Sequence, residues 1–205
     1  MFAPFVFAAL AADPGAKLPP LPLLVFIFAA ASPILAALCA WPGLRFADRA
    51  QLPMPLLRAW EAQEAAPRGV WPRIIPVALL AGGVAGVCVV VLVRVMHIPR
   101  NPGGLSARLL TVVFAASVPE IITHLFAMSG LQLLLKRTWP AILLSSALFV
   151  AIFHGGHVGN AIVTALVLGA NFLLGTITGW VYSRYGFEGA MLTHAVAHLI
   201  AVGVN

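Results

Sequence analysis

The chain has 205 residues, of which 61% are hydrophobic and only 9% are charged, and its formal net charge is +6. A soluble domain carries roughly 25% charged residues, so this composition excludes a protein whose whole surface faces water. The mean hydropathy of +1.01 agrees with that exclusion. The basic residues flank apolar runs and no aromatic-rich basic patch accompanies them, which indicates membrane lipid as a partner and no nucleic acid.

Apolar runs near 20 residues long predict an all-α fold, a polytopic bundle of membrane helices. A run of that length crosses about 30 Å of hydrocarbon, and lipid tolerates no unpaired backbone, which favours helices. About six transmembrane helices are expected, and Met1–Ala12 could add a short apolar segment at the N-terminus. The expected spans are Leu21–Trp41, Ile75–His97, Leu109–Leu135, Ala141–Phe153, Ile162–Tyr182 and Gly189–Val204.

Pro42–Arg73 is the long polar connection, and within it Leu56–Ala65 is expected to form a short surface helix. We divide the chain into N-terminal membrane helices (residues 1–108, with the amphipathic loop 42–73) and a C-terminal helix core (residues 109–205). The loop 42–73, Lys136–Arg137 and Arg184 share the side richer in Lys and Arg, which the positive-inside rule places in the cytoplasm. The expected location is a prokaryotic inner membrane.

A carboxylate lies inside the third expected span, at Glu120. An ionised carboxylate in hydrocarbon needs a partner or must take up a proton. His124 follows one turn later on the same helix face, so the two side chains can share a hydrogen bond, and Pro119 interrupts the helical hydrogen bonds just before them. Such buried polar groups usually mark function; the structural alternative is a neutral Glu120 bonded to a neighbouring helix.

Histidines gather in two later segments. His154 and His157 end the fourth span, and interfacial histidines that simply reach water are the alternative there. His194 and His198 lie four residues apart on one face of the last span, where two imidazoles can bind one zinc ion or bond to other helices. With a glutamate these are the usual parts of metal-assisted hydrolysis. Asn171, in the fifth span, is expected to bond across to another helix.

Three short patterns follow one another in the C-terminal half: Pro119-Glu-Ile-Ile-Thr-His124, Phe153-x-x-x-His157 and His194-x-x-x-His198. In this order they resemble the Glu-Glu-x-x-x-Arg, Phe-x-x-x-His and His-x-x-x-Asn/Asp signatures of the CPBP family of intramembrane metalloproteases, also called the Abi or CAAX-protease family. The resemblance covers Ser117 to Val202.

The first pattern departs from the family. On the preferred register Glu120 takes the first glutamate position, Ile121 replaces the second glutamate, and Leu125 stands at the arginine position with His124 beside it. A register one residue earlier would put Pro119 at the catalytic position and His124 at the arginine. The third pattern carries a histidine where the family has Asn or Asp.

The resemblance implies an intramembrane endopeptidase that hydrolyses a peptide bond of a peptide or protein substrate in or near the membrane. Glu120 would activate water as a general base, with His124 beside it. His157, or His154 in its place, would join His194 and His198 to hold a divalent metal, expected to be zinc, or to orient water directly.

Other functions stay open. The altered first pattern also suits a non-catalytic CPBP-fold protein that serves binding or immunity. A proton or solute carrier can use the same Glu and His side chains, although the inverted repeats typical of transporters are missing from the sequence. A rhomboid-type serine protease with Ser129 as nucleophile has its histidine segment in the wrong order.

Overall fold

The computed structural model describes residues 21–95, 105–154 and 161–203, and this part of the chain is helical without strands. The helices, in chain order, are α2 (Leu21–Arg49), α3 (Pro55–Glu61), α4 (Val70–Val95), α5 (Leu105–Pro119), η1 (Glu120–Met128), α6 (Ser129–Leu135), α7 (Thr138–His154), α8 (Ala161–Tyr185) and α9 (Phe187–Gly203). The predicted all-α bundle is confirmed. The apolar N-terminal segment Met1–Ala12 lies outside the described residues.

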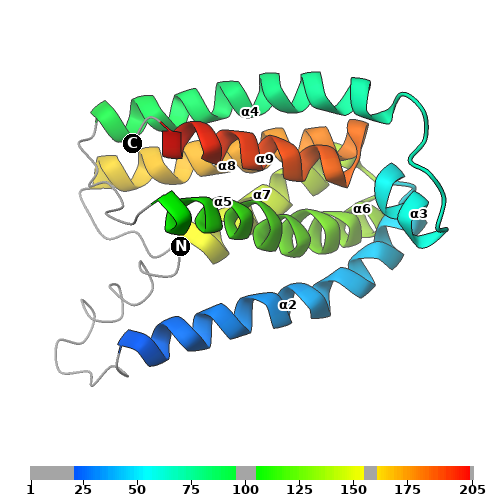
Figure 1. Cartoon of the computed structure of the whole chain (residues 1–205), viewed down its shortest axis with the longest axis horizontal. Coiled ribbons are helices and arrows are strands. Elements are labelled where there is room, and N and C mark those ends of the chain that lie inside the picture. Colours follow the sequence, from blue (N-terminus) through cyan, green and yellow to red (C-terminus); the bar gives the residue numbers. More distant parts are fainter. Residues whose placement is uncertain (1–20, 96–104, 155–160, 204–205) are drawn as a thin grey trace.

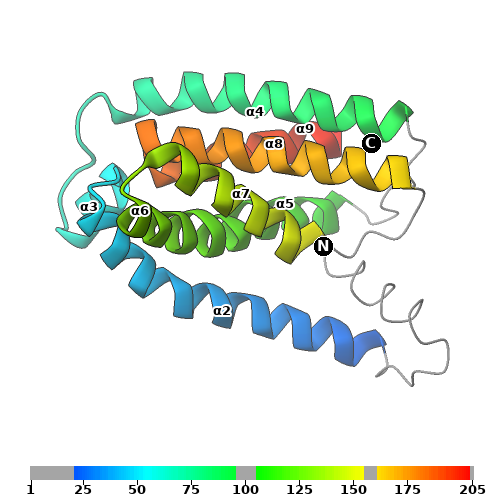
Figure 2. The ribbon, with the colours of Figure 1, turned by 180° about the vertical axis from the view of Figure 1, so that it is seen from behind.

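The long helices run side by side, and α5, η1 and α6 follow one another as one continuous rod (Figures 1 and 2). Helices α8 and α9 lie between α4 on one side and this rod on the other, and α2 covers the opposite side of the rod. The main packing partners are α4 with α9, α7 with α8, and α2 with η1. The rod that carries Glu120 is therefore enclosed by other helices.

Polar and apolar side chains are distributed as in an integral membrane protein. Among the residues that the structure describes, three segments are long and apolar enough to cross a bilayer, Val70–Leu92, Val112–Leu135 and Ala161–Tyr185, while α7 and α9 are shorter apolar helices. Large apolar side chains face outward, with Leu80 72% and Leu38 68% exposed. Lipid, unlike water, stabilises such a surface, so the bundle belongs in a membrane.

The first helix is longer than expected. Helix α2 continues through Pro42 to Arg49, so the predicted connection from Pro42 to Arg73 was too long. Tertiary packing explains the extension, because Ala47 is fully buried and a Cβ on Gly43 would lie 3.0 Å from Leu125 Cγ. Close contact with η1 thus compensates for the hydrogen bond that Pro42 removes from the helix.

The predicted surface helix exists, but it spans Pro55–Glu61 rather than Leu56–Ala65. It is held by Glu188 at the start of α9, whose Oε1 accepts hydrogen bonds from the backbone N–H groups of Leu56 (2.9 Å) and Leu57 (2.7 Å). A carboxylate at a helix N-terminus satisfies unpaired donors and interacts favourably with the helix dipole. Trp60 on this helix is 78% exposed.

Two glycines on α4 allow α9 to approach closely. A Cβ on Gly82 would lie 2.4 Å from the carbonyl oxygen of Thr193, and one on Gly86 would lie 2.8 Å from that of Ala197. Small residues four apart let membrane helices pack backbone against backbone. Because α9 carries His194 and His198, this contact fixes the depth of both histidines in the bundle.

Candidate functional site

Glu120 begins a π-helical segment, η1. In it the backbone is wider than in an α-helix, as shown by the Ser129 N–H bond to the carbonyl of His124, five residues back. Pro119 precedes it and lacks an N–H donor, and Thr123 Oγ1 donates a 2.7 Å hydrogen bond to the Pro119 carbonyl. Sequence reasoning detected the interruption at Pro119 but missed the π-helix, a rare conformation that is frequent at functional sites.

The Thr123 hydroxyl should contribute measurably to the stability of this segment. Thr123→Val keeps the shape but removes the bond to the Pro119 carbonyl in a fully buried position. We expect the free energy of unfolding to fall by about 1 to 2 kcal/mol. The matched control is Thr176→Val, because Thr176 makes the same kind of bond to Phe172 at an exposed position. Equal losses for both variants, measured by thermal unfolding in detergent, would contradict a special role for Thr123.

The carboxylate of Glu120 lies between two histidines from different helices. Its Oε1 accepts a 2.7 Å hydrogen bond from Nδ1 of His194 on α9, and its Oε2 lies 2.9 Å from Nδ1 of His124. The second contact is an ion pair by distance, but its angles do not fit a hydrogen bond, so Oε2 has no well-oriented donor. Glu120, His124 and His194 are each at most 1% exposed. Burial strengthens these electrostatic contacts because the surroundings screen them weakly.

The partners of His124 determine where a proton must lie. Its Nε2 is 3.0 Å from the carbonyl oxygen of Gly175, which can only accept, so Nε2 carries a hydrogen. A neutral ring would then present a lone pair to Glu120 Oε2 at 2.9 Å, which is repulsive. One additional proton is therefore shared by the pair, either on His124 as an imidazolium or on Glu120 as an acid.

His198 extends the polar chain towards the edge of the bundle. Its Nε2 lies 3.2 Å from Nε2 of His194, and the two rings stack with centroids 5.0 Å apart. Since Nδ1 of His194 donates to Glu120, Nε2 of His194 is free to accept from His198. His198 is only partly buried, so the network reaches the surface of the bundle at this end.

Phe149 connects the fourth span to the same site. Its ring meets the rings of His194 and His154 edge to face, with centroids 5.7 Å and 5.1 Å apart. Thus His154, one of the two histidines predicted for this span, lies beside the network, whereas His157 lies outside the described residues. Phe149 was not predicted as a site residue, since a buried aromatic in an apolar helix carries no specific signal.

Two residues, Leu125 and Ile121, stand where the family pattern has a charged side chain, and both contact apolar neighbours. Leu125, at the arginine position, is 2% exposed and packs against Gly43 of α2. Ile121, at the second glutamate position, packs on the apolar clusters of the core. The basic group next to Glu120 is therefore His124, a contact that is compatible with either register.

Two other predicted polar residues lie apart from this network. Asn171 donates a 2.8 Å hydrogen bond to the carbonyl of Val167 in its own helix, so the predicted bond to another helix is wrong. A side-chain amide in a helix can donate to the backbone carbonyl one turn earlier, so it needs no partner on another helix. The Ser129 hydroxyl is buried and lies 2.9 Å from Tyr182 Oη rather than beside a histidine ring, unlike a serine-protease nucleophile.

A comparison with known families covers the segment that carries this network. Residues 101–200 match the family model of the type II CAAX prenyl endopeptidases, Rce1-like. This segment belongs to the CPBP family. The Rce1-like segment contains Glu120 and every histidine of the network. No curated protein and no solved structure matches the chain.

The described part of the Rce1-like segment provides an incomplete set of zinc ligands. The two Nε2 atoms of His194 and His198, 3.2 Å apart, have about the spacing of two nitrogens bound to one tetrahedral zinc. A carboxylate on the far nitrogen, as Glu120 is on His194, is common beside metal ligands. Within residues 21–95, 105–154 and 161–203, however, no group of three or more His, Cys, Asp or Glu side chains could hold a metal. A third ligand would have to come from outside this part, where His157 lies.

Proposed function

We propose that the chain is an intramembrane endopeptidase that hydrolyses a peptide bond of a prenylated substrate at the Glu120–His194–His198 network. The proposal draws its substrate class from the description of the matching family. The observation that carries it is the 2.7 Å bond between Glu120 Oε1 and His194 Nδ1, which joins two helices inside the bundle. A buried carboxylate–imidazole pair with a partly accessible end is suited to activating water.

In this proposal Glu120 is the general base. Because Oε1 is occupied by His194, Oε2 is the oxygen that would take a proton from water while the water oxygen attacks the peptide carbonyl carbon. The carboxyl would then return that proton to the departing amine. His124 must hold the additional shared proton for Glu120 to act as a base, so His124 serves as the counter-ion of the carboxylate. His194 and His198 would orient the water.

A bound zinc ion is a secondary part of the proposal. His194 and His198 would supply two nitrogen ligands, and His157 the third. Bound zinc would lower the pKa of a coordinated water and make it a better nucleophile. The alternative is that the two histidines orient water without a tightly held metal.

The direct test is hydrolysis of a farnesylated CAAX peptide by the full chain in proteoliposomes. We expect wild type to release the C-terminal tripeptide and His194→Ala to lose about 10²-fold or more of the rate. Metal analysis of both proteins decides the cofactor: about one zinc per chain in wild type and none in His194→Ala is expected for a tetrahedral centre. A wild-type protein that hydrolyses the peptide without zinc would refute the metal but leave the endopeptidase.

A non-catalytic membrane protein of the same fold is the second candidate. It is favoured by one observation, that both oxygens of Glu120 already contact imidazole nitrogens while the carboxylate itself is only 1% exposed. In that case the network would only stabilise the packing of α9 against η1. Absence of hydrolysis by correctly folded wild type, with a binding phenotype unaffected by changes at Glu120, would support this candidate.

A further inference from the structure

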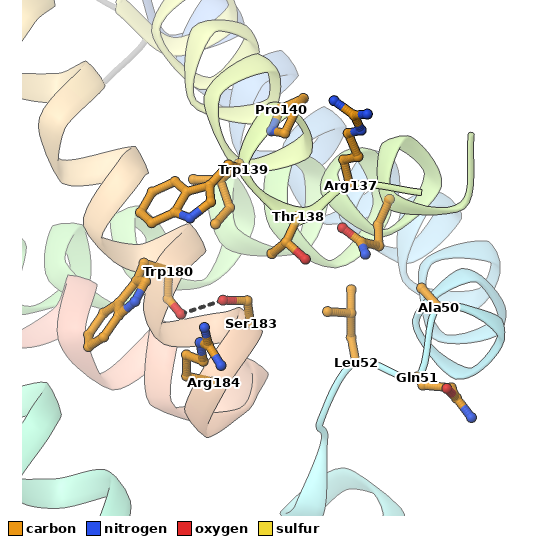
Figure 3. Close-up of a pocket in the computed structure, with 12 residues that line it drawn as sticks. Ala50, Gln51, Leu52, Arg137, Thr138, Trp139, Pro140, Trp180, Ser183 and Arg184 are labelled. Carbon is orange, nitrogen blue, oxygen red and sulfur yellow. Dashed lines mark hydrogen bonds between the residues drawn. The ribbon is translucent and has the colours of Figure 1, made fainter. Parts of the chain in front are cut away.

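A polar cavity lies away from the histidine network, at one end of the bundle. Its volume is about 650 Å³. It lies where α2 and α8 finish and where the α6–α7 turn begins α7, and Figure 3 shows the side chains that surround it. None of Glu120, His124, His194 and His198 lines it. The proposed hydrolysis makes no use of this cavity.

The charge of the cavity is positive. Arg137 and Arg184 line it, and none of its lining residues is acidic. Both arginine side chains are exposed, and in the described part of the chain neither guanidinium has a carboxylate within ion-pair distance. By contrast, Arg58 at the same end is paired with Asp48 and Glu61. Two unpaired guanidinium groups beside one cavity favour an anion, and their planar donors suit phosphate oxygens in particular.

The remaining walls combine aromatic rings with polar groups. Trp139 and Trp180 lie along one side, and the hydroxyls of Thr138 and Ser183 lie near the middle (Figure 3). Gln132 also lines the cavity, and its side-chain oxygen is buried without a hydrogen-bond partner. A buried acceptor without a partner costs free energy, so a ligand that brings a donor would be stabilised there.

The position of the cavity indicates the source of the anion. It lies at the helix ends, where Lys136, Arg137 and Arg184 mark the border of the apolar spans Val112–Leu135 and Ala161–Tyr185. Basic residues and tryptophans at this depth lie at the level of lipid headgroups, and basic pockets between membrane helices bind anionic headgroups.

We propose that this cavity binds the headgroup of an anionic phospholipid, with the phosphodiester at Arg137 and Arg184 and a headgroup hydroxyl donating to Gln132. The phosphate receives charge-assisted hydrogen bonds from the two guanidinium groups. The tryptophan rings cover the glycerol region, and the acyl chains extend along the apolar outer surface. Phosphatidylglycerol has the required phosphate and hydroxyl, whereas the headgroup of phosphatidylcholine has no donor and no net charge.

Native mass spectrometry of the delipidated full chain tests the proposal. We expect wild type to bind phosphatidylglycerol at least about tenfold more tightly than phosphatidylcholine, and the double variant Arg137→Gln/Arg184→Gln to lose roughly tenfold or more of that affinity. The matched control is Arg68→Gln/Arg73→Gln, which removes the same charge from exposed residues that do not line the cavity. Gln132→Leu should weaken phosphatidylglycerol but leave phosphatidic acid, which lacks the headgroup hydroxyl, nearly unchanged.

Three outcomes would overturn the proposal. The first is an equal loss of affinity in the cavity variant and the control variant, which would mean that charge alone attracts the lipid. The second is no preference for phosphatidylglycerol in wild type. The third is protection of the protein by inorganic phosphate without lipid binding, which would assign the cavity to a free anion. Thermal unfolding of each variant in detergent verifies that the proteins compared are folded.

Discussion

Glu120→Gln should reduce peptide hydrolysis by about 10² to 10⁴-fold, with the effect on kcat rather than on KM. The substitution keeps the shape of the side chain, and the amide oxygen can still accept the hydrogen bond from His194 Nδ1. What it removes is the basic oxygen that faces His124 and would take the proton from water. The rate should be measured in proteoliposomes with a farnesylated CAAX peptide over a range of concentrations.

The matched control for this substitution is Glu188→Gln. Glu188 is a half-buried carboxylate at the start of α9, and its oxygen accepts from two backbone N–H groups of α3. A glutamine oxygen can accept the same bonds, so hydrolysis should stay within about threefold of wild type, as expected for a site with no role in proton transfer. Unchanged hydrolysis in Glu120→Gln would end the general-base assignment. Equal losses in both variants would show that any change in carboxylate charge disturbs the bundle.

Gly82→Ala should damage both stability and activity, although the atoms nearest to a Cβ at this position belong to Thr193 and Val196. The new Cβ would lie 2.4 Å from the Thr193 carbonyl oxygen and 2.8 Å from Val196 Cβ, so α9 must move away from α4. Overpacking of this kind costs about 1 to 3 kcal/mol. Since α9 carries His194 and His198, we also expect the hydrolysis rate to fall by about 10²-fold, because a shift of about 1 Å in a site has that effect.

The neighbouring residue provides the control for this second prediction. A Cβ on Gly83 would meet nothing within 4 Å, so Gly83→Ala should leave the rate unchanged and should raise helix stability by up to about 1 kcal/mol. Thermal unfolding in detergent and the peptide assay should be run on both variants. A Gly82→Ala protein as stable and as active as Gly83→Ala would refute the role of the α4–α9 contact. The predicted loss of stability in Gly82→Ala does not depend on peptidase activity, so thermal unfolding tests it even if the protein hydrolyses no peptide.

Much of the fold was predictable because hydropathy alone indicates which segments of a membrane protein can form transmembrane helices. The expected spans Ile75–His97 and Leu109–Leu135 overlap α4 and the α5–η1–α6 rod. The errors lie at helix ends, as in the extension of α2 to Arg49, where packing of Ala47 decides the outcome rather than local sequence. The π-helix was also missed, because its wider turn depends on how η1 packs among its neighbours as well as on Pro119.

The candidate site was predictable in its residue types but not in its pairings. A Glu and a His four residues apart, Glu120 and His124, indicated a shared hydrogen bond; the structure brings Oε2 and Nδ1 to 2.9 Å as an ion pair, without hydrogen-bond geometry. The Phe149 contacts with two histidine rings were not foreseeable, since they join side chains from different helices. The role of His157 stays a prediction.

The amino-acid sequence by itself determined that this protein is a bundle of membrane helices with ionisable groups inside it, because the cost of placing charge and bare backbone in lipid is paid locally, residue by residue. Only the tertiary structure decided that Glu120 meets His194, 74 residues further along the chain. It also decided that Arg137, between α6 and α7, and Arg184, near the end of α8, share one cavity. Such contacts depend on how closely the helices approach, which Gly82 and its neighbours on α9 set through three-dimensional packing.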